Sequence, residues 1–360
     1  MFLIIHGCGD SNPNDALEKP ETLQTGWVIG YDENYTAVIL HTENGGKKWV
    51  VQGDNTQWVG HNGNDISAVD NETAWAALDA KSLNGIGKIL HTTDGGMTWI
   101  EQILPNAVDS GIKGIKGLSR NEAWAVSLTG TILHTMDGGK VWNVVDHPNV
   151  EIKEVNRMDV ISYADTHSSI NNNIWIVDEK GGDFGMMHSL NNGDTWRAEH
   201  IENSVSGSGA HMVSAYSSQV VWAAKWFDGN IYRTADGGES WESVAQVGPN
   251  DIDDMCAYSA DALWFVQYQS GYAQTGNIYH YHTEDEKVQQ FTPIEQYKYE
   301  GLTCMNNQTA IVVGYTDVVD PPQQRGLIII TNDGGKTWEN QPLPVDDVRL
   351  WKVSFVGMHR

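Results

Sequence analysis

The feature that most constrains the fold is a string of eleven residues that recurs along the chain. Its clearest copy is ILHTTDGGMTW at Ile89–Trp99. Apolar and polar residues partly alternate in Ile89–Thr92, as on a half-buried strand. Asp94 and the two glycines after it favour a tight turn, because the carboxylate accepts backbone N–H bonds and glycine adopts positive φ without steric cost. The string therefore predicts a strand, a turn, and a second strand that begins at the tryptophan.

The copies are spaced like the units of a repeat protein. One copy, Ile278–Phe291, is degenerate: it lacks both glycines and has Phe291 in place of tryptophan. The aromatic ends of successive copies are 43 to 54 residues apart, a period typical of solenoids and propellers. The remaining copies are Ile39–Trp49, Ile132–Trp142, Met186–Trp196, Ile231–Trp241 and Ile328–Trp338.

A second mark recurs upstream of each turn. It is an aromatic residue within a short apolar run, such as TAWAAL from Thr73, and only the last repeat has AIVVG instead. Together the two marks divide each repeat into four short strands. In the second repeat we expect these strands at Asp65–Asp70, Ala74–Leu78, Lys88–Thr92 and Thr98–Gln102.

The two ends of the chain complement each other. The first repeat lacks its first strand, whereas a surplus strand, Val348–Val356, follows the last repeat. The sequence therefore predicts an all-β, seven-bladed propeller of four-stranded antiparallel blades, in which the C-terminal strand completes the first blade and closes the ring. We expect residues 23–360 to form this single domain, and residues 1–22 to be a signal remnant or a tether.

The N-terminus leaves two interpretations open. Met1–Cys8 is too short for a membrane span or a complete signal peptide. Cys8 after Gly7 resembles the end of a bacterial lipoprotein signal, so either the true start lies upstream or the likeness is coincidental. We expect an extracytoplasmic protein, either secreted or lipid-anchored in the bacterial envelope, that contacts a membrane only through a lipid on Cys8.

The other two cysteines, Cys256 and Cys304, fall in expected inner strands of adjacent repeats. A bridge is conceivable, but we favour two buried free thiols, because free cysteine behaves as a small apolar residue. No Cys/His cluster suggests zinc.

The charge balance restricts the classes of partner. The chain has 22 Lys and Arg against 47 Asp and Glu, a net charge of −25. Nucleic acids and anionic membranes both reward clustered Lys and Arg, so neither is expected as a partner. Cationic partners, surface calcium or simple solubility are all compatible with this charge. We expect a monomer without cofactor or metal site.

The recurring turn residues are expected to be structural. The carboxylate would cap each turn and the tryptophan would wedge between blades. A metal or sugar site at each turn fails on spacing, because seven turns on separate blades point outward and cannot converge on one ligand. Five histidines, one in each of five repeats, are also interpreted as structural because a ring spaces them too far apart to share an ion. The turn residues are Asp94, Asp137, Asp236, Asp333, Trp49, Trp99, Trp142, Trp196, Trp241 and Trp338; the histidines are His41, His91, His134, His188 and His280.

Any binding site should lie on the opposite face, where the inner strands begin and the second-to-third-strand loops meet the channel. Exposed aromatic residues beside charges are typical of recognition surfaces. Such loops can also be merely solvated, and that alternative stays open. From the inner strands we expect Asp65, Lys113, His211, Asp253, Asp254, Glu300 and Arg349; from the loops, Trp226, Phe227, Tyr268 and Tyr272.

The turn string resembles the Asp-box (BNR) repeat of sialidases, sortilins and several glycosidases. The fuller pattern, AWAV followed by ILHTxDGGxTW, resembles the photosystem II stability/assembly factor family. That resemblance implies a non-catalytic propeller that grips a protein partner during assembly of a membrane complex. The family's photosynthetic members are associated with an arginine-rich surface, and this acidic chain departs from that pattern. We therefore expect a binding scaffold for protein or glycan in a non-photosynthetic bacterium.

The alternative function is a glycan-active enzyme. A sialidase needs an arginine triad, and the seven arginines of the chain do not suggest one. A glycoside hydrolase with two carboxylates stays possible, because Asp65, Asp253, Asp254 and Glu300 are expected near one channel mouth.

Overall fold

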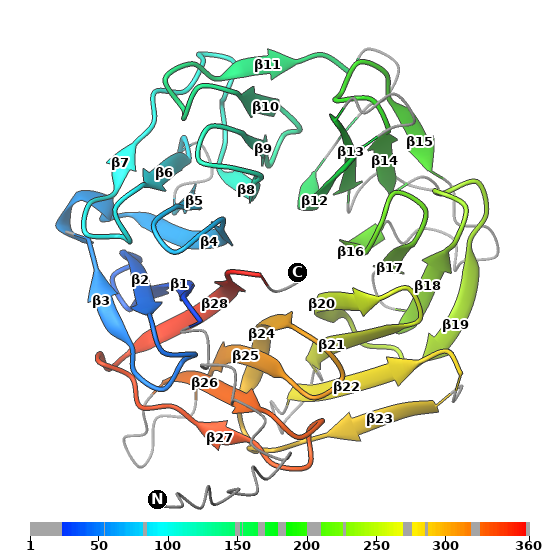
Figure 1. Cartoon of the computed structure of the whole chain (residues 1–360). Helices are drawn as coiled ribbons and strands as arrows, with labels where there is room; N and C mark the ends of the chain where they lie inside the picture. Colours follow the sequence, from blue (N-terminus) through cyan, green and yellow to red (C-terminus); the bar gives the residue numbers. More distant parts are fainter. Residues whose placement is uncertain are drawn as a thin grey trace, which may run out of the picture.

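Seven four-stranded antiparallel sheets stand around one axis and form a closed ring (Figure 1). The computed structural model describes residues 24–53, 55–81, 85–147, 152, 154–164, 170–178, 185–199, 210–225, 228–268, 276–284, 287–317 and 325–357. The tether, Cys8, and the loop residues Trp226, Phe227 and Tyr272 lie outside these ranges. The all-β seven-bladed prediction is confirmed.

Each sheet is one blade, numbered here from the blade that contains β1. Blades 1 to 3 comprise β28 (Val348–Phe355), β1 (Gly26–Asp32), β2 (Ala37–Thr42) and β3 (Val50–Gln52); β4 (His61–Ala68), β5 (Ala74–Ala80), β6 (Lys88–Thr92) and β7 (Ile100–Glu101); and β8 (Ile112–Gly117), β9 (Ala123–Ser127), β10 (Ile132–Thr135) and β11 (Asn143–Val145). A single short 3-10 helix among the described residues, η1 (Asn55–Trp58), precedes β4.

Blades 4 to 7 follow the same order from the inside outward. They comprise β12 (Val155–Ala164), β13 (Ile170–Asp178), β14 (Met186–Ser189) and β15 (Arg197–Glu199); β16 (Ala210–Ala215), β17 (Val221–Lys225), β18 (Asn230–Thr234) and β19 (Glu242–Gln246); β20 (Ile252–Ser259), β21 (Ala262–Tyr268), β22 (Gly276–His282) and β23 (Lys287–Phe291); and β24 (Lys298–Cys304), β25 (Ala310–Tyr315), β26 (Gly326–Thr331) and β27 (Glu339–Asn340).

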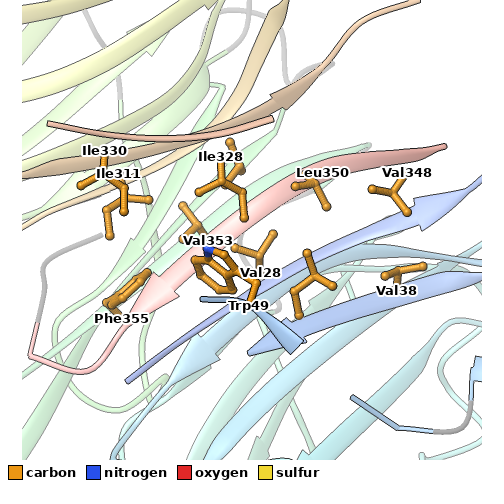
Figure 2. Packing of buried hydrophobic residues seen from close by; sticks show 12 residues of the cluster. Val28, Val38, Trp49, Ile311, Ile328, Ile330, Val348, Leu350, Val353 and Phe355 are labelled. Carbon is orange, nitrogen blue, oxygen red and sulfur yellow. The ribbon is translucent and has the colours of Figure 1, made fainter. Parts of the chain in front are cut away.

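Ring closure depends on the pairing of the last strand with the first. β28 runs antiparallel to β1, with Gly26 opposite Phe355 and Val28 opposite Val353. A Cβ on Gly30 would meet the Arg349 carbonyl oxygen at 2.0 Å, so the bulge at this point requires glycine. Figure 2 shows Trp49, Val353 and Phe355 of blade 1 packed towards Ile311, Ile328 and Ile330 of blade 7. The predicted closing strand is thus confirmed, and its apolar face seals the last gap in the ring.

The recurring tryptophans connect neighbouring blades. Trp142 of blade 3 meets Trp75 of blade 2 edge-on at 5.7 Å between ring centroids. Trp241 meets Trp175 in the same way at 5.8 Å. Trp338 of blade 7 meets Trp264 of blade 6 in the same way, at 6.1 Å. Phe291, in the degenerate repeat, differs: it lies 5.8 Å from Trp264 of its own blade and 6.4 Å from Trp338 of the following blade.

The glycine-containing turns are held by a repeated hydrogen-bond set. Thr92 Oγ1 donates to Asp94 Oδ1, and the Gly96 amide donates to Thr92 Oγ1. Asp94 also accepts bonds from the backbone and the hydroxyl of Thr98. Gly95 and Gly96 have φ of +71° and +81°, a region that disfavours other residues. The carboxylate therefore caps the turn through local contacts.

The recurring histidines stack on tryptophans of the adjacent strand. Trp75 and His91 lie in register on β5 and β6, with ring centroids 3.5 Å apart and planes at 5°. Where Arg233 replaces histidine, its guanidinium lies 5.6 Å from the Trp222 ring. Burial lowers the pKa of His91 to about 4, so its ring is neutral at pH 7. The equivalent stacks are Trp27–His41, Trp124–His134, Trp175–His188 and Trp264–His280.

One expectation is wrong. Cys256 on β20 and Cys304 on β24 form a disulfide that joins the inner strands of blades 6 and 7. Both residues are fully buried. Free thiols were expected because both sites are apolar. That expectation did not consider the register of the two strands, which places Cys256 and Cys304 opposite each other between the blades.

Candidate binding face

The two faces of the ring carry different parts of each repeat. The glycine turns lie beside the turns that join the first and second strands, as the bond from the Gly95 amide to the Glu72 carbonyl shows. The opposite face, called the channel face here, carries the starts of the inner strands and the ends of the second strands. Among the described residues that were predicted to bind a ligand, the following belong to this face: Lys113, His211, Asp253, Glu300, Tyr268 and Arg349.

A cavity of about 280 Å³ opens at the axis on the channel face, and every blade contributes to its lining. Of the predicted binding residues, Lys113, His211, Asp253 and Glu300 line it together. The other lining residues are Asn64, Asn156, Arg157, Met212, Trp351 and Lys352. A ring of seven inner strands therefore converges on one polar site, although its residues are spread over almost 300 positions of sequence.

Asp65 and Asp254 occupy a different position from the one expected. Both carboxylates are buried and connect one inner strand to the next. Asp65 accepts a bond from the Ile115 amide of blade 3, at 2.9 Å, and Asp254 accepts one from the Leu302 amide of blade 7, at 3.0 Å. Asp159 makes the equivalent contact with Ala215 of blade 5. These carboxylates join adjacent blades beneath the cavity.

The positive charges at the axis are largely committed to Asp254. Arg157 of β12 forms a hydrogen-bonded ion pair with it, and Lys352 Nζ lies 3.2 Å from the same carboxylate. Burial lowers the pKa of Lys352 to about 8. Lys352 also donates to the backbone carbonyl of Glu300, at 3.2 Å. These contacts tie blades 1, 4, 6 and 7 together across the channel.

Two cavity carboxylates, Asp253 and Glu300, lie on adjacent blades and differ from ordinary surface acids. Burial, together with the negative charge of Glu300, raises the pKa of Asp253 well above its usual range. Burial raises the pKa of Glu300 to about 7, against the opposing effect of Lys352. Asp253 also accepts a short bond from the Tyr268 amide, at 2.6 Å. Around neutral pH the pair therefore holds protons that surface acids would have lost.

Beside the cavity, aromatic rings and cations alternate across blades 6, 7 and 1. Lys298 Nζ lies 5.0 Å from the Tyr268 ring centroid and 5.2 Å from that of Tyr315. The Arg349 guanidinium lies 5.4 Å from Tyr315 and 5.9 Å from Tyr31. These five residues are called the aromatic–cation row. Asp317 pairs with both cations, at 3.2 Å and 3.0 Å, and so fixes their positions.

The row continues into the loop between β1 and β2. Tyr35 stacks on Tyr31 at 5.7 Å, and Lys81 of blade 2 lies 4.0 Å from the Tyr35 ring. Tyr35 has φ of +60°, which is costly for an aromatic residue, by about 1–3 kcal/mol. Hydrogen bonds from Asn34 and Thr36 to Asp32 hold this loop. Strained residues cluster at ligand-binding surfaces, and Tyr35 extends the surface of the aromatic–cation row beyond Tyr31.

Sequence reasoning found part of this face. It identified Tyr268 and Arg349 but missed Tyr31, Tyr315, Lys298 and Trp351. Tyr31 and Tyr315 look like ordinary apolar strand residues, and only their position at the ends of β1 and β25, second to last and last, places them on the channel face. The presence of Trp351 outside both recurring patterns was the one available indication.

Within the described part of the chain, no group of three or more His, Cys, Asp or Glu side chains is placed to hold a metal ion. Among the same residues, no helix has the length and apolarity needed to cross a membrane.

Comparisons with known proteins agree with the resemblance in the repeats. The sequence model of the family described as photosynthesis system II assembly factor YCF48 matches residues 107–257, so the chain resembles that family across its middle blades. A search of the curated proteins found no sequence match.

Solved structures share the fold at low identity. YCF48 from Cyanidioschyzon merolae has a TM-score of 0.58 at 15% identity, covering 92% of this chain and 96% of its own. The structure of YCF48 bound to a D1 peptide has a TM-score of 0.57 at 15% sequence identity, and the match covers 83% of this chain and 92% of that one. An ancestral GH74 enzyme has a TM-score of 0.53 at 16% sequence identity, and the match covers 78% of this chain and 38% of that one. At these identities the likeness shows the propeller fold alone.

Proposed function

We propose that this chain is a non-catalytic binding propeller that holds a segment of a protein partner on the channel face. The observation that carries the proposal is the aromatic–cation row beside a cavity lined by all seven blades. Tyrosine, tryptophan and arginine are the residues that dominate the energetics of protein interfaces. Their rings and cations are held in place before binding, which reduces the entropy lost on association.

The likeness to YCF48 supports a protein as the partner. One YCF48 structure contains a D1 peptide, so a propeller of this shape can hold a peptide. The partner of this chain need not resemble that peptide, because its channel face has its own set of residues.

The proposal is tested by placing a photo-crosslinking amino acid at Tyr31 or Tyr268 in the full chain, in cells. A protein crosslink is expected at both sites, and Arg349→Glu should weaken it at least about tenfold by removing a central cation of the row. The control site is the exposed Lys336, in the glycine turn of blade 7 on the opposite face. Equal crosslinking from Lys336, or none from the row, would refute the proposal.

We also propose an extracytoplasmic location. The disulfide between Cys256 and Cys304 supports it, since structural disulfides persist mainly in oxidising compartments. The test is to trap thiols with a maleimide in intact cells: the pair should resist labelling until a reductant is added. Immediate labelling of both thiols after denaturation would contradict this location.

A second candidate, glycan hydrolysis, is favoured by the adjacent carboxylates of Asp253 and Glu300. A carboxyl group with a pKa of about 7 is suited to general acid catalysis. The test is release of reducing sugar from a panel of glycans, and turnover that disappears in Glu300→Gln while the fold survives would favour the enzyme over the scaffold.

A further inference from the structure

Exposed apolar side chains are distributed very unevenly around the ring. Ten of the eleven large apolar residues that are strongly exposed lie within Val50–Val144, on blades 1 to 3 and the segments between them. Within the described residues of blades 5 to 7 there are none. The outer strands β19 and β27 instead read ESVAQ and EN. An apolar edge confined to one side indicates an interaction surface, because the fold does not need it.

A groove lies on the apolar edge between blades 2 and 3, on the face of the glycine turns. The groove has a volume of about 410 Å³. Its lining includes Ile100 and Ile103, which are 63% and 85% exposed, and Arg120 and Lys140 of blade 3. His91, stacked on Trp75, is part of the lining. We call this site the blade 2–3 groove.

The acidic residues of the groove are engaged in local contacts, whereas its cations are exposed. Glu101 pairs with Lys88 at 2.6 Å, and the Asp137 carboxylate caps its own turn through Thr135 and Val141. Arg120 is 55% exposed, and its contacts among the described residues are long: 3.3 Å to the Thr93 carbonyl and 3.9 Å to Glu72. Lys140 is exposed, and its charge helps to lower the pKa of Asp137. The groove therefore places two exposed cations beside two isoleucines.

The repeat supplies a natural comparison between blades 6 and 7. A groove at the corresponding place there has a volume of about 270 Å³. Its lining includes His280, His282, Lys287, Gln289 and Lys336, and no large aliphatic side chain. Lys336 follows its Gly-Gly pair as Lys140 does. The two grooves thus share a backbone plan and a lysine, and they differ in the isoleucines and in Arg120, whose place Asn307 takes in blade 7.

We propose that the blade 2–3 groove binds a segment of a protein partner that presents a large aliphatic side chain next to a carboxylate. The aliphatic group would cover Ile100 and Ile103, and the carboxylate would pair with Arg120 and Lys140. Charge complementarity favours this occupant: a cationic segment would find two like charges, and a purely polar one would leave the isoleucines in water. This site is separate from the channel face and can bind at the same time.

The test uses three short fluorescent peptides and the full chain, with anisotropy as the measurement. The first alternates leucine and aspartate, the second leucine and lysine, and the third serine and aspartate. Only the first should bind. Ile103→Ser and Lys140→Glu should each weaken its binding at least about tenfold, and both changes lie on exposed residues that the fold does not need.

Lys336→Glu is the matched control, because it makes the same charge change in the groove without isoleucines. It should leave binding of the leucine–aspartate peptide unchanged. The proposal is overturned if that peptide fails to bind at up to about 1 mM, if the leucine–lysine peptide binds as well, or if Lys336→Glu is as harmful as Lys140→Glu. Concentration-dependent self-association that Ile103→Ser abolishes, without peptide binding, would instead assign the groove to a second copy of the chain.

Discussion

At the scale of single residues, the glycine turns show which parts of a motif are chemically replaceable. Asn44 stands where Asp94 does, and its side-chain oxygen still accepts the bond from the Lys48 amide. In the turn of blade 4, the Asn191 oxygen likewise accepts from the Thr195 amide. The Thr195 hydroxyl lies 3.0 Å from the Asn191 amide nitrogen and 3.2 Å from its oxygen, whereas Asp94 accepts from the Thr98 hydroxyl at 2.6 Å. An amide thus preserves the backbone contact and changes only the bond to the hydroxyl.

We therefore expect Asp94→Asn and Asp94→Ala to differ clearly. The asparagine variant should lose less than about 0.5 kcal/mol of unfolding free energy, since two turns of the chain already use asparagine. The alanine variant leaves the turn amides without their acceptor and should lose about 1–2 kcal/mol. Urea unfolding of both variants measures the difference, and equal losses would show that charge, rather than hydrogen bonding, holds the turn.

The raised pKa of Glu300 leads to a prediction of how the free energy of unfolding depends on pH. Its folded pKa of about 7 lies above the ordinary value of 4.5, so the folded state binds a proton that the unfolded chain releases. The stabilising contribution is complete below about pH 4.5 and is lost as the pH rises towards 7. Glu300→Gln, which cannot ionise, should therefore be more stable than the native chain at pH 8 and nearly equal at pH 4.

The expected gain at pH 8 is on the order of 1–2 kcal/mol, less than the full shift implies because the side chain is only partly shielded from water. Thermal unfolding at both pH values measures it. Glu339→Gln, on an exposed outer strand, is the control and should show no such difference. A gain of the same size at pH 4 would mean that packing, and not ionisation, is responsible.

At the scale of elements, the inner strands are connected by more than their shared core. Side chains reach from one blade to the backbone of the next, as Ser354 Oγ does to the Ala68 amide and Ser214 Oγ to the Ala257 amide. Between β20 and β24 the connection is covalent. These two strands carry Asp253 and Glu300, so the disulfide holds together the two blades that supply both cavity carboxylates.

Removal of this disulfide should have a measurable cost. The bridge closes a loop with a sequence separation of 48 residues, and such a loop corresponds to a stabilisation of about 2–4 kcal/mol. The double variant Cys256→Ala/Cys304→Ala should lose this amount in urea unfolding. A reductant should lower the native chain to the same level and leave the double variant unchanged. A native chain indifferent to reductant would contradict the prediction.

At the scale of the whole molecule, the sequence predicted architecture better than chemistry. The blade number, the four strands per blade and the closing strand follow from spacing, because each Trp and each turn recurs once per blade. The outer strand of blade 2 is shorter than expected, with Ile100–Glu101 in place of Thr98–Gln102. Short outer strands at the rim make few hydrogen bonds to their neighbours. A strand of two residues is also too short to show an alternation of apolar and polar residues, so its bounds cannot be predicted from the sequence.

The binding face was only partly predictable for a geometric reason. Its residues come from different blades, and their proximity depends on where each strand ends. The pattern ranks Asp65 and Asp253 alike, yet one carboxylate joins two blades and the other lines the cavity. Similarly, the cysteine pairing requires the register of β20 against β24, which no single repeat contains. The periodic pattern thus predicts the features that every blade shares, but not the contacts that single blades make with one another.

The junction of β1 and β28 also determines how the molecule can be held. Gly26 and Phe355 are opposite each other, and the Val356 amide donates to the Thr25 carbonyl, so the first and last described segments lie side by side on the face of the glycine turns. A label placed on Gln24 or Gly357 would therefore sit on the face opposite the cavity and leave the channel face open to a partner.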